Sequence, residues 1–203
     1  MNASDFTGAD FNEFLHEAAE REINGVMFYC MDTAGDNDTK IDMCKAKARK
    51  AGAFAMGKAE DELGETDFDM FLEQGAQDQV EDIMETCMKN VGSNATKARG
   101  CENKAKRAAA KIMGRREEDI DDTEFGRIKE KAAQEAVRTK MEACSTGSCE
   151  AAAKDAAKRV LGKRDDETFD DDDFEDIQEG AAEEAIETFM EACRAAAREN
   201  TDA

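Results

Sequence analysis

Apolar residues recur along this chain with the spacing of one face of an α-helix, and the same series of positions appears four times. Counting from Phe68 as zero, apolar or small residues follow at +3, +7, +8, +12 and +16, and a cysteine follows at +19. Steps of three, four and five place these residues on one face of a helix. Matching series begin at Phe11, Phe125 and Phe174. Each predicts a helix of roughly 20 residues, about 30 Å long.

A second, alanine-rich helix is expected after each of the first three. Each begins at a further cysteine, and the three starting residues are Cys44, Cys101 and Cys149. Each is expected to end at a glycine that a lysine or arginine follows: Gly57, Gly114 and Gly162. Glycine is the common residue just past a helix, and a cation suits the negative end of the helix dipole. These signals predict hairpins over residues 8–58, 66–115 and 123–163.

The cysteines show that the two-helix unit repeats with a constant period of 57 positions. This step separates Cys30 from Cys87 and Cys87 from Cys144, and it also separates Cys44 from Cys101. The third unit has lost about nine residues between its two cysteines. We therefore expect an all-α fold, a tandem repeat of antiparallel helical hairpins: three hairpins plus a C-terminal capping helix. One array would cover residues 1–203, with units of approximately 8–64, 65–121 and 122–170 and a half-repeat of 171–203.

Composition agrees with helices and excludes several classes of partner. The chain has no proline and no tryptophan, and 49 acidic residues against 28 basic ones give a net charge of −21. Such a charge repels nucleic acid and anionic membrane surfaces. No apolar run reaches the roughly 20 residues that span a bilayer. The sequence predicts no nucleic-acid partner and no membrane span, and it pairs acidic first helices with basic second helices.

Three pairs of cysteines lie where one predicted helix ends and the next begins. They are Cys30 with Cys44, Cys87 with Cys101, and Cys144 with Cys149. Residues facing each other across such a hairpin neck can meet the Cα separation of about 5–6 Å that a disulfide needs. A loop of about 15 residues closed in this way gains on the order of 3 kcal/mol. The alternative is a set of small buried thiols.

Disulfides favour an oxidising compartment, and three candidate N-glycosylation sites agree with one. These sites are Asn2, Asn37 and Asn94, and the last two are separated by one full period and lie in equivalent loops. The matched pair is explained equally by two copies of one polar loop. We expect an extracellular or secretory location although no signal peptide is visible in this chain, the alternative being a cytoplasmic protein with reduced cysteines.

Cys193 is left over when the six neck cysteines are paired. It occupies the position of a first neck cysteine, but no matching second helix follows in the sequence. An odd cysteine in an oxidising compartment suggests a bond between two chains. The alternative is a buried thiol on the capping helix.

The linkers between units are rich in carboxylates, the ligands that Ca²⁺ prefers. The candidate residues are Glu118, Asp119, Asp121, Asp122, Asp170, Asp171, Asp172 and Asp173. No linker has the alternating acids and the sixth-position glycine of an EF-hand loop, so any binding is expected to be weak and diffuse.

No catalytic constellation is visible, and His16 is the only histidine. We therefore expect no enzyme and no cofactor other than Ca²⁺. The sequence favours a non-enzymatic structural or protein-interaction protein that binds protein partners or assembles with itself into a dimer or polymer. The alternative function is calcium binding by the acidic linkers.

Overall fold

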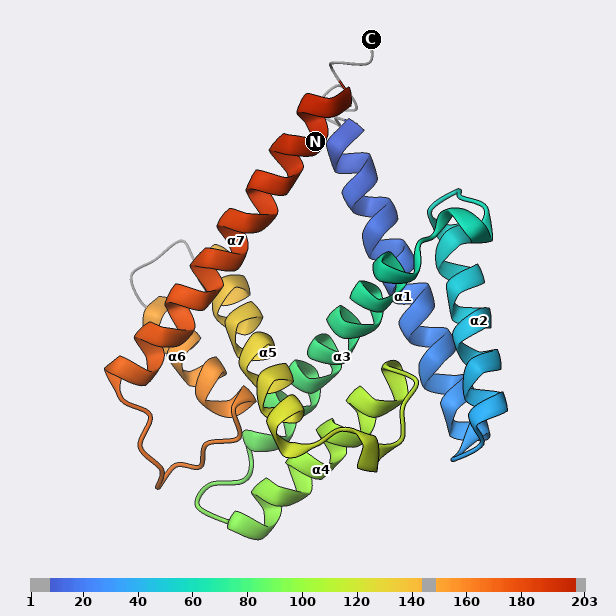
Figure 1. Ribbon diagram of the computed structural model, residues 1–203. Coiled ribbons are helices and arrows are strands. Elements are labelled where there is room, and N and C mark those ends of the chain that lie inside the picture. The colour runs from blue at the N-terminus through green and yellow to red at the C-terminus, as the bar shows by residue number, and fades with distance from the viewer. Residues whose placement is uncertain (1–7, 144–148, 200–203) are drawn as a thin grey trace. The chain divides into compact units, whose positions relative to one another are not determined.

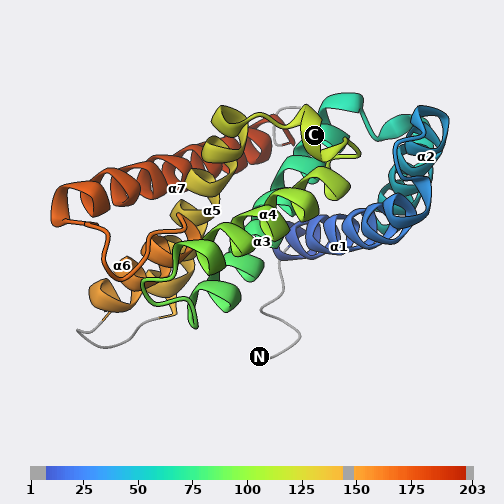
Figure 2. The same ribbon diagram turned by 90° about the horizontal axis from the view of Figure 1, so that it is seen from below.

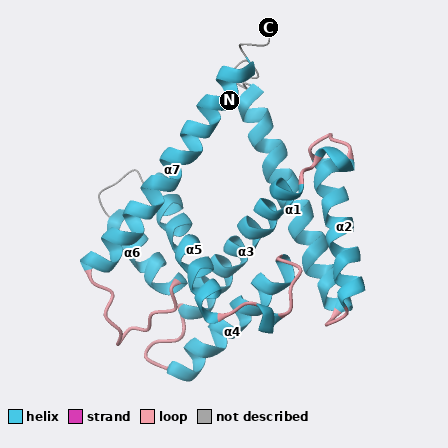
Figure 3. Ribbon diagram, in the orientation of Figure 1, coloured by secondary structure: helices cyan, strands magenta, loops and turns pink. Residues whose placement is uncertain are grey.

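The computed structural model describes residues 8–143 and 149–199, and all regular structure in these ranges is helical (Figures 1 and 3). Its α-helices are α1 (Gly8–Ala34), α2 (Asp38–Ala55), α3 (Glu65–Met88), α4 (Ala95–Ile112), α5 (Asp122–Glu142), α6 (Cys149–Val160) and α7 (Asp171–Glu199). Two 3₁₀ turns, η2 (Glu60–Glu62) and η3 (Glu117–Asp119), lie in the linkers. The predicted all-α class is confirmed. None of the described helices is long and apolar enough to cross a membrane.

The short helices end at the glycines that the sequence indicates. Gly57, Gly114 and Gly162 have φ angles of 67°, 60° and 79°, a left-handed conformation that glycine adopts without steric cost. The next residue donates its N–H back to the helix, as in Lys58 N to Ala53 O at 2.9 Å. Such bonds satisfy carbonyls at the end of a helix that would otherwise have no partner.

Side-chain oxygens satisfy the opposite ends of several helices. Asn37 caps α2 by accepting the N–H of Lys40 at 3.0 Å, and Asn94 accepts the N–H of Lys97 at 3.0 Å ahead of α4. Asn, Asp and Ser are the residues that helix starts favour for this bond. These caps start α2 at Asp38 and α4 at Ala95, six residues before Cys44 and Cys101. The expectation that these two helices begin at the cysteines is therefore wrong, whereas α6 does begin at Cys149.

The chain divides into two compact units, Met1–Val80 with Asn103–Phe125, and Glu81–Glu102 with Gly126–Ala203. In the first unit, α1 and α2 lie side by side and antiparallel (Figure 1). Gly52 of α2 allows close approach, since an added Cβ would lie 2.5 Å from Ile23 Cδ1. The Arg49 guanidinium donates to Leu63 O, with Nε at 2.9 Å, which holds the linker after α2 against this hairpin.

In the second unit, α6 packs beside the start of α7 (Figures 1 and 2). The Lys154 ammonium of α6 lies 5.9 Å from the centroids of both Phe169 and Phe174, and it pairs with Asp171 at 2.5 Å. Gly180 of α7 lies against the side chain of Gln134 in α5. These contacts place the start of α7 against both α5 and α6.

The predicted apolar face of the long helices is buried in some helices and exposed in others. Phe71, Ile128 and Ile177, all at position +3 of the series, are buried. Their counterpart Phe14 is 58% exposed. Met141, Ile186 and Met190, later members of the same series, are also 42%, 63% and 45% exposed. The series therefore marks one face of each helix without deciding its burial: the exposed members are Phe11, Phe14, Met141, Ala182, Ile186 and Met190.

Candidate protein-interaction groove

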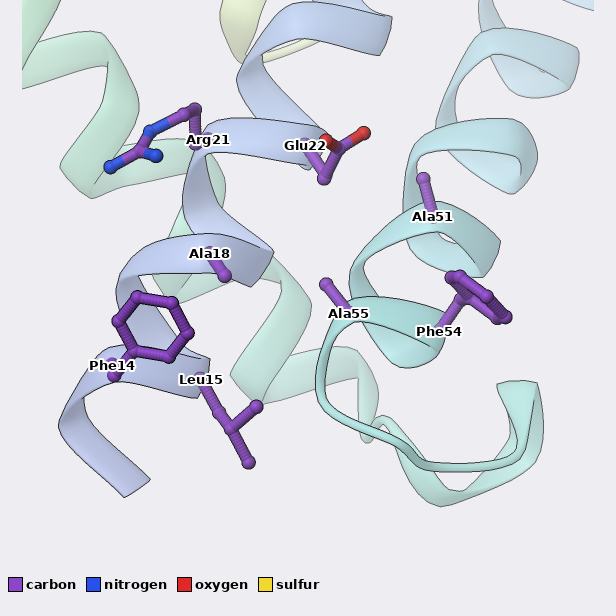
Figure 4. A pocket seen from close by; sticks show the side chains of 8 residues that line it. All are labelled: Phe14, Leu15, Ala18, Arg21, Glu22, Ala51, Phe54 and Ala55. Carbon is purple, nitrogen blue, oxygen red and sulfur yellow. The ribbon is translucent and has the colours of Figure 1, made fainter. Parts of the chain in front are cut away.

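An open apolar groove of about 370 Å³ lies between α1 and α2 (Figure 4). Its lining residues come from both helices and are Phe14, Leu15, Ala18, Arg21, Glu22, Ala51, Phe54 and Ala55. Figure 4 shows Ala18 on α1 facing Ala51 and Ala55 on α2. The small side chains hollow the surface, and Phe14 and Phe54, the latter 86% exposed, flank it. Clustered exposed apolar side chains commonly mark an interaction surface.

The corresponding face of α3, also in the first unit, is covered by α1. The ring of His16 lies 4.4 Å from the ring of Phe71, centroid to centroid. Gly75 lies directly against the side chain of Asn24, where a Cβ would collide with it. Burial lowers the pKa of His16 below its usual value. The ring of His16 therefore packs against Phe71 on one side, and the residue stays exposed on the other.

The end of α4 meets α1 as well. The Lys111 ammonium lies 5.0 Å from the centroid of Phe28 and pairs with the carboxylate of Asp32. A cation above an aromatic ring is attracted to its negative face. Together with the preceding contacts, residues at every fourth position of α1 face the α3 and α4 segments of this unit. The residues of this stripe are His16, Glu20, Asn24, Phe28 and Asp32.

Two carboxyl groups meet at the middle of this contact. Burial first, and then a side-chain hydrogen bond with Asp78, raise the pKa of Glu20 to about 8. Two carboxyls can share a hydrogen bond only when one carries a proton. Glu20 is therefore the protonated partner near neutral pH.

Two of the three predicted disulfides are bonded in the structure. Cys30–Cys44 and Cys87–Cys101 have Cα–Cα distances of 5.6 Å and 5.7 Å, and each spans 14 residues. Cys149 begins α6, but Cys144 lies outside the described residues, so that pair stays a prediction. Cys193 lies on α7, where its side chain is outside the described part, and its predicted bond to another chain is untested.

The candidate glycosylation sites have a second explanation. Asn37 and Asn94 are exposed, and each is the residue whose side chain caps the following helix. The capping role alone accounts for their matched positions. Asn2 lies outside the described residues. Glycosylation stays a prediction.

Several carboxylates proposed for Ca²⁺ are engaged in caps or ion pairs. Asp119 pairs with Arg116 at 3.0 Å, and this hydrogen bond lowers the pKa of Asp119. Likewise, the hydrogen bond from Lys154 lowers the pKa of Asp171. Asp121 caps α5, Asp122 pairs with Lys106 at 3.1 Å, and Glu118 lies 3.9 Å from Arg116.

The second acidic linker is arranged similarly. Asp170 and Asp173 exchange hydrogen bonds with each other's backbone N–H, and Asp172 is exposed. Among the described side chains, no three candidate ligands are gathered to hold a metal ion. Calcium binding stays a prediction, which a calorimetric titration with CaCl₂ would test.

The groove itself was not predicted from the sequence, although one signal for it exists. Phe54 occupies the place that Lys111 and Arg159 take in the other two short helices, counted from the starting cysteine. Lys111 and Arg159 each contact a residue of an earlier long helix. An aromatic residue at the same position of α2 therefore indicates that α2 has a different neighbour there. Comparison with known protein families, curated proteins and solved structures finds no match for this chain.

Proposed function

We propose that this protein is a non-enzymatic scaffold of tandem helical hairpins, stapled by disulfides, whose first groove binds a helical segment of a protein partner. The groove carries the proposal, because the equivalent face of α3 is covered by a helix while Phe14 and Phe54 stand exposed. The regular repeat of the hairpins belongs to the proposal as well. Disulfides at two necks favour an oxidising compartment, extracellular or in the secretory lumen.

Contacts at matched positions support the repeat. A Cβ at Gly114 would lie 2.7 Å from the methyl carbon of Met27, and one at Gly162 would lie 3.1 Å from that of Met84. Met84 stands one full period after Met27, and the two glycines end the second and third short helices. In each compact unit, a long helix thus meets the C-terminal glycine of a short helix that follows later in the chain.

Charged contacts repeat in the same register. Lys106 pairs with Asp122 in the first compact unit, as Lys154 pairs with Asp171 in the second. Both lysines stand five residues after a neck cysteine, Lys106 after Cys101 and Lys154 after Cys149. The same lysine–aspartate pairing recurs although the loop between the two cysteines of the third repeat is about nine residues shorter.

A further pair of contacts links each long helix to a later short helix. Lys111 lies over Phe28, and Arg159 lies 3.6 Å from the carboxylate of Glu85, which is the counterpart of Phe28 in the next repeat. One contact is a cation above a ring and the other an ion pair, so the chemistry differs while the position is kept. Repeat proteins stack neighbouring units through such recurring contacts.

This stacking explains the exposed positions in the series. Met27 and Met84 are covered beside the glycines that end later short helices, and Met141 has no such glycine among the described residues. Phe71 is covered by His16, whereas no described helix occupies the equivalent place on Phe14. The exposed face of α1 around Phe14 is therefore the one on which an additional helix would stack.

The proposal is tested with the helix that the chain itself places on α3. A fluorescein-labelled peptide of residues 8–34 with Cys30→Ser would be titrated with the oxidised protein and followed by anisotropy. We expect saturable binding that Ala18→Gln weakens at least tenfold, because a long side chain fills the groove. Ala46→Gln, the same change at an exposed position of α2, is the control. Absence of saturable binding, or equal effects of the two substitutions, would overturn the proposal.

A further inference from the structure

The last long helix has a stripe with the spacing of the α1 stripe. Aligned on Phe11 and Phe174, Glu179 of α7 takes the place of His16, and Glu183 takes the place of Glu20. Both glutamates are exposed. Ile186 and Met190, which take the places of the buried Ile23 and Met27, are exposed as well. In this α7 stripe, formed by Glu179 and Glu183, the second glutamate is exposed, whereas its counterpart Glu20 is half-buried against Asp78.

One basic and one acidic side chain line the groove, Arg21 and Glu22, and the basic one is opposite in charge to the glutamates of the α7 stripe. In the α1–α3 contact, Glu20 faces Asp78, a pair of acids that requires a shared proton. Arg21, at the position equivalent to Asp78, lines the groove beyond Ala18, and its side chain points away from α2 (Figure 4). A helix docked there in the same register would place Glu183 opposite Arg21. The acid–acid contact would then be replaced by an ion pair between opposite charges.

We propose that the groove between α1 and α2 binds α7 of a second copy of this chain, head to tail. The occupant is α7 because the α1 stripe already packs on α3 and α4, whereas Glu179 and Glu183 are exposed. This inference rests on the proposed function and names the partner of its groove.

Head-to-tail contact has a structural consequence. The groove and the α7 stripe are different surfaces, so each copy offers one of each and the interface is heterologous. Such contacts produce open chains unless their rotation closes a ring. We therefore expect assembly beyond a dimer, with a mean mass that rises with concentration.

Charge reversal tests the contact. The oxidised full chain with Cys193→Ser, which excludes covalent linkage through that residue, would be studied by light scattering across a concentration series. We expect the starting protein to grow in mass with concentration. Arg21→Glu alone and Glu183→Arg alone are each expected to weaken association at least tenfold. An equimolar mixture of the two variants is expected to restore it, because each docked pair again has opposite charges.

The controls change charge by the same amount elsewhere. Lys40→Glu in α2 and Glu150→Arg in α6 lie at exposed positions outside both surfaces and should leave the mass unchanged. A monomer at every concentration, or single variants that assemble like the starting protein, would overturn the inference. Failure of the mixture to restore assembly would overturn it too. If the groove binds a helix but that helix is not α7 of a second copy, the anisotropy titration with the peptide of residues 8–34 would still show saturable binding.

Discussion

At the scale of single residues, the contact between α1 and α3 depends on one proton. Glu20 is half-buried beside Asp78, with Glu17 adding further negative charge and Arg21 partly offsetting it. Burial and the neighbouring carboxyl penalise the ionised form. The folded state therefore holds a proton on Glu20 at pH values where an unfolded chain, with its ordinary glutamate pKa, has released it.

Glu20→Gln is expected to change how stability depends on pH. The pKa of Glu20 is about 8 when folded, so its favourable contribution is complete below the ordinary glutamate pKa and is lost as pH rises through 8. At pH 9 the variant should be more stable than the parent by about 1–2 kcal/mol, after allowance for solvent screening of a half-exposed group. Near pH 4 the two should be equally stable.

Urea unfolding at pH 4, 6.5 and 9 measures this difference. Glu22→Gln, an exposed change on the same helix, controls for the general effect of net charge. If the free energy of unfolding changes with pH in the same way for the parent and the Glu20 variant, the proton on Glu20 does not contribute to stability.

Gly52 provides a second prediction at the residue scale. A Cβ there would lie 2.5 Å and 2.7 Å from two side-chain carbons of Ile23, which is fully buried. Gly52→Ala should therefore destabilise the fold by about 1–3 kcal/mol. Gly100→Ala in α4, where nothing lies within 4 Å of the new carbon, should stabilise it by about 0.5–1 kcal/mol. Thermal melting of the pair tests both signs, and a loss of stability in both would contradict the argument.

At the scale of elements, the α1–α2 hairpin is defined by its neck and its helix ends. The first helix pair is closed by Cys30–Cys44 at one end and finishes at Gly57 at the other. The seam between them uses small residues such as Ala48 and Gly52, which allow close approach but bury little apolar area. The disulfide at the neck therefore adds stability to a helix pair whose seam buries little apolar area.

Removing that crosslink should cost stability. Cys30→Ala with Cys44→Ala reopens a loop whose ends are 14 residues apart and should lower the free energy of unfolding by about 3 kcal/mol. Chemical denaturation of the oxidised proteins measures the loss. Addition of a reducing agent should affect the double variant less than the parent, and an equal effect on both would indicate that this neck contributes nothing.

At the scale of the whole molecule, the net charge of −21 opposes the association of this chain with a second copy of itself. Two acidic chains repel each other at long range, so self-assembly needs a local match such as Arg21 against Glu183. The same repulsion is screened by salt. Assembly through the groove therefore depends on a local charge pattern that the net charge opposes.

The predicted bond between chains through Cys193 belongs to this scale. Electrophoresis of the natively sourced protein without reducing agent should show a species of twice the monomer mass, and reduction should convert it to monomer. Cys193→Ser should remove that species while leaving the necks oxidised. Monomer in both lanes for the parent would exclude a covalent link and leave the noncovalent inference standing.

The sequence predicts the helices and necks well because their signals act over short distances. Gly57, Gly114 and Gly162 end helices through bonds reaching back only a few residues, and the bonded cysteines are 14 residues apart. The groove could not be predicted in this way. Phe14 and Phe71 hold equivalent positions in the series, yet 58% of one is exposed and only 2% of the other.

Helix content, the glycine-capped helix ends and the spacing of the two bonded necks were thus determined by the sequence alone, because periodicity, capping and chain reversal are local properties. The tertiary structure decided which apolar faces are covered, since His16 reaches Phe71 from a distant part of the chain and no described helix reaches Phe14. It also decided that Glu20 meets Asp78 and retains a proton. Burial depends on the neighbouring helix, and the neighbour is set by how the helices pack in three dimensions.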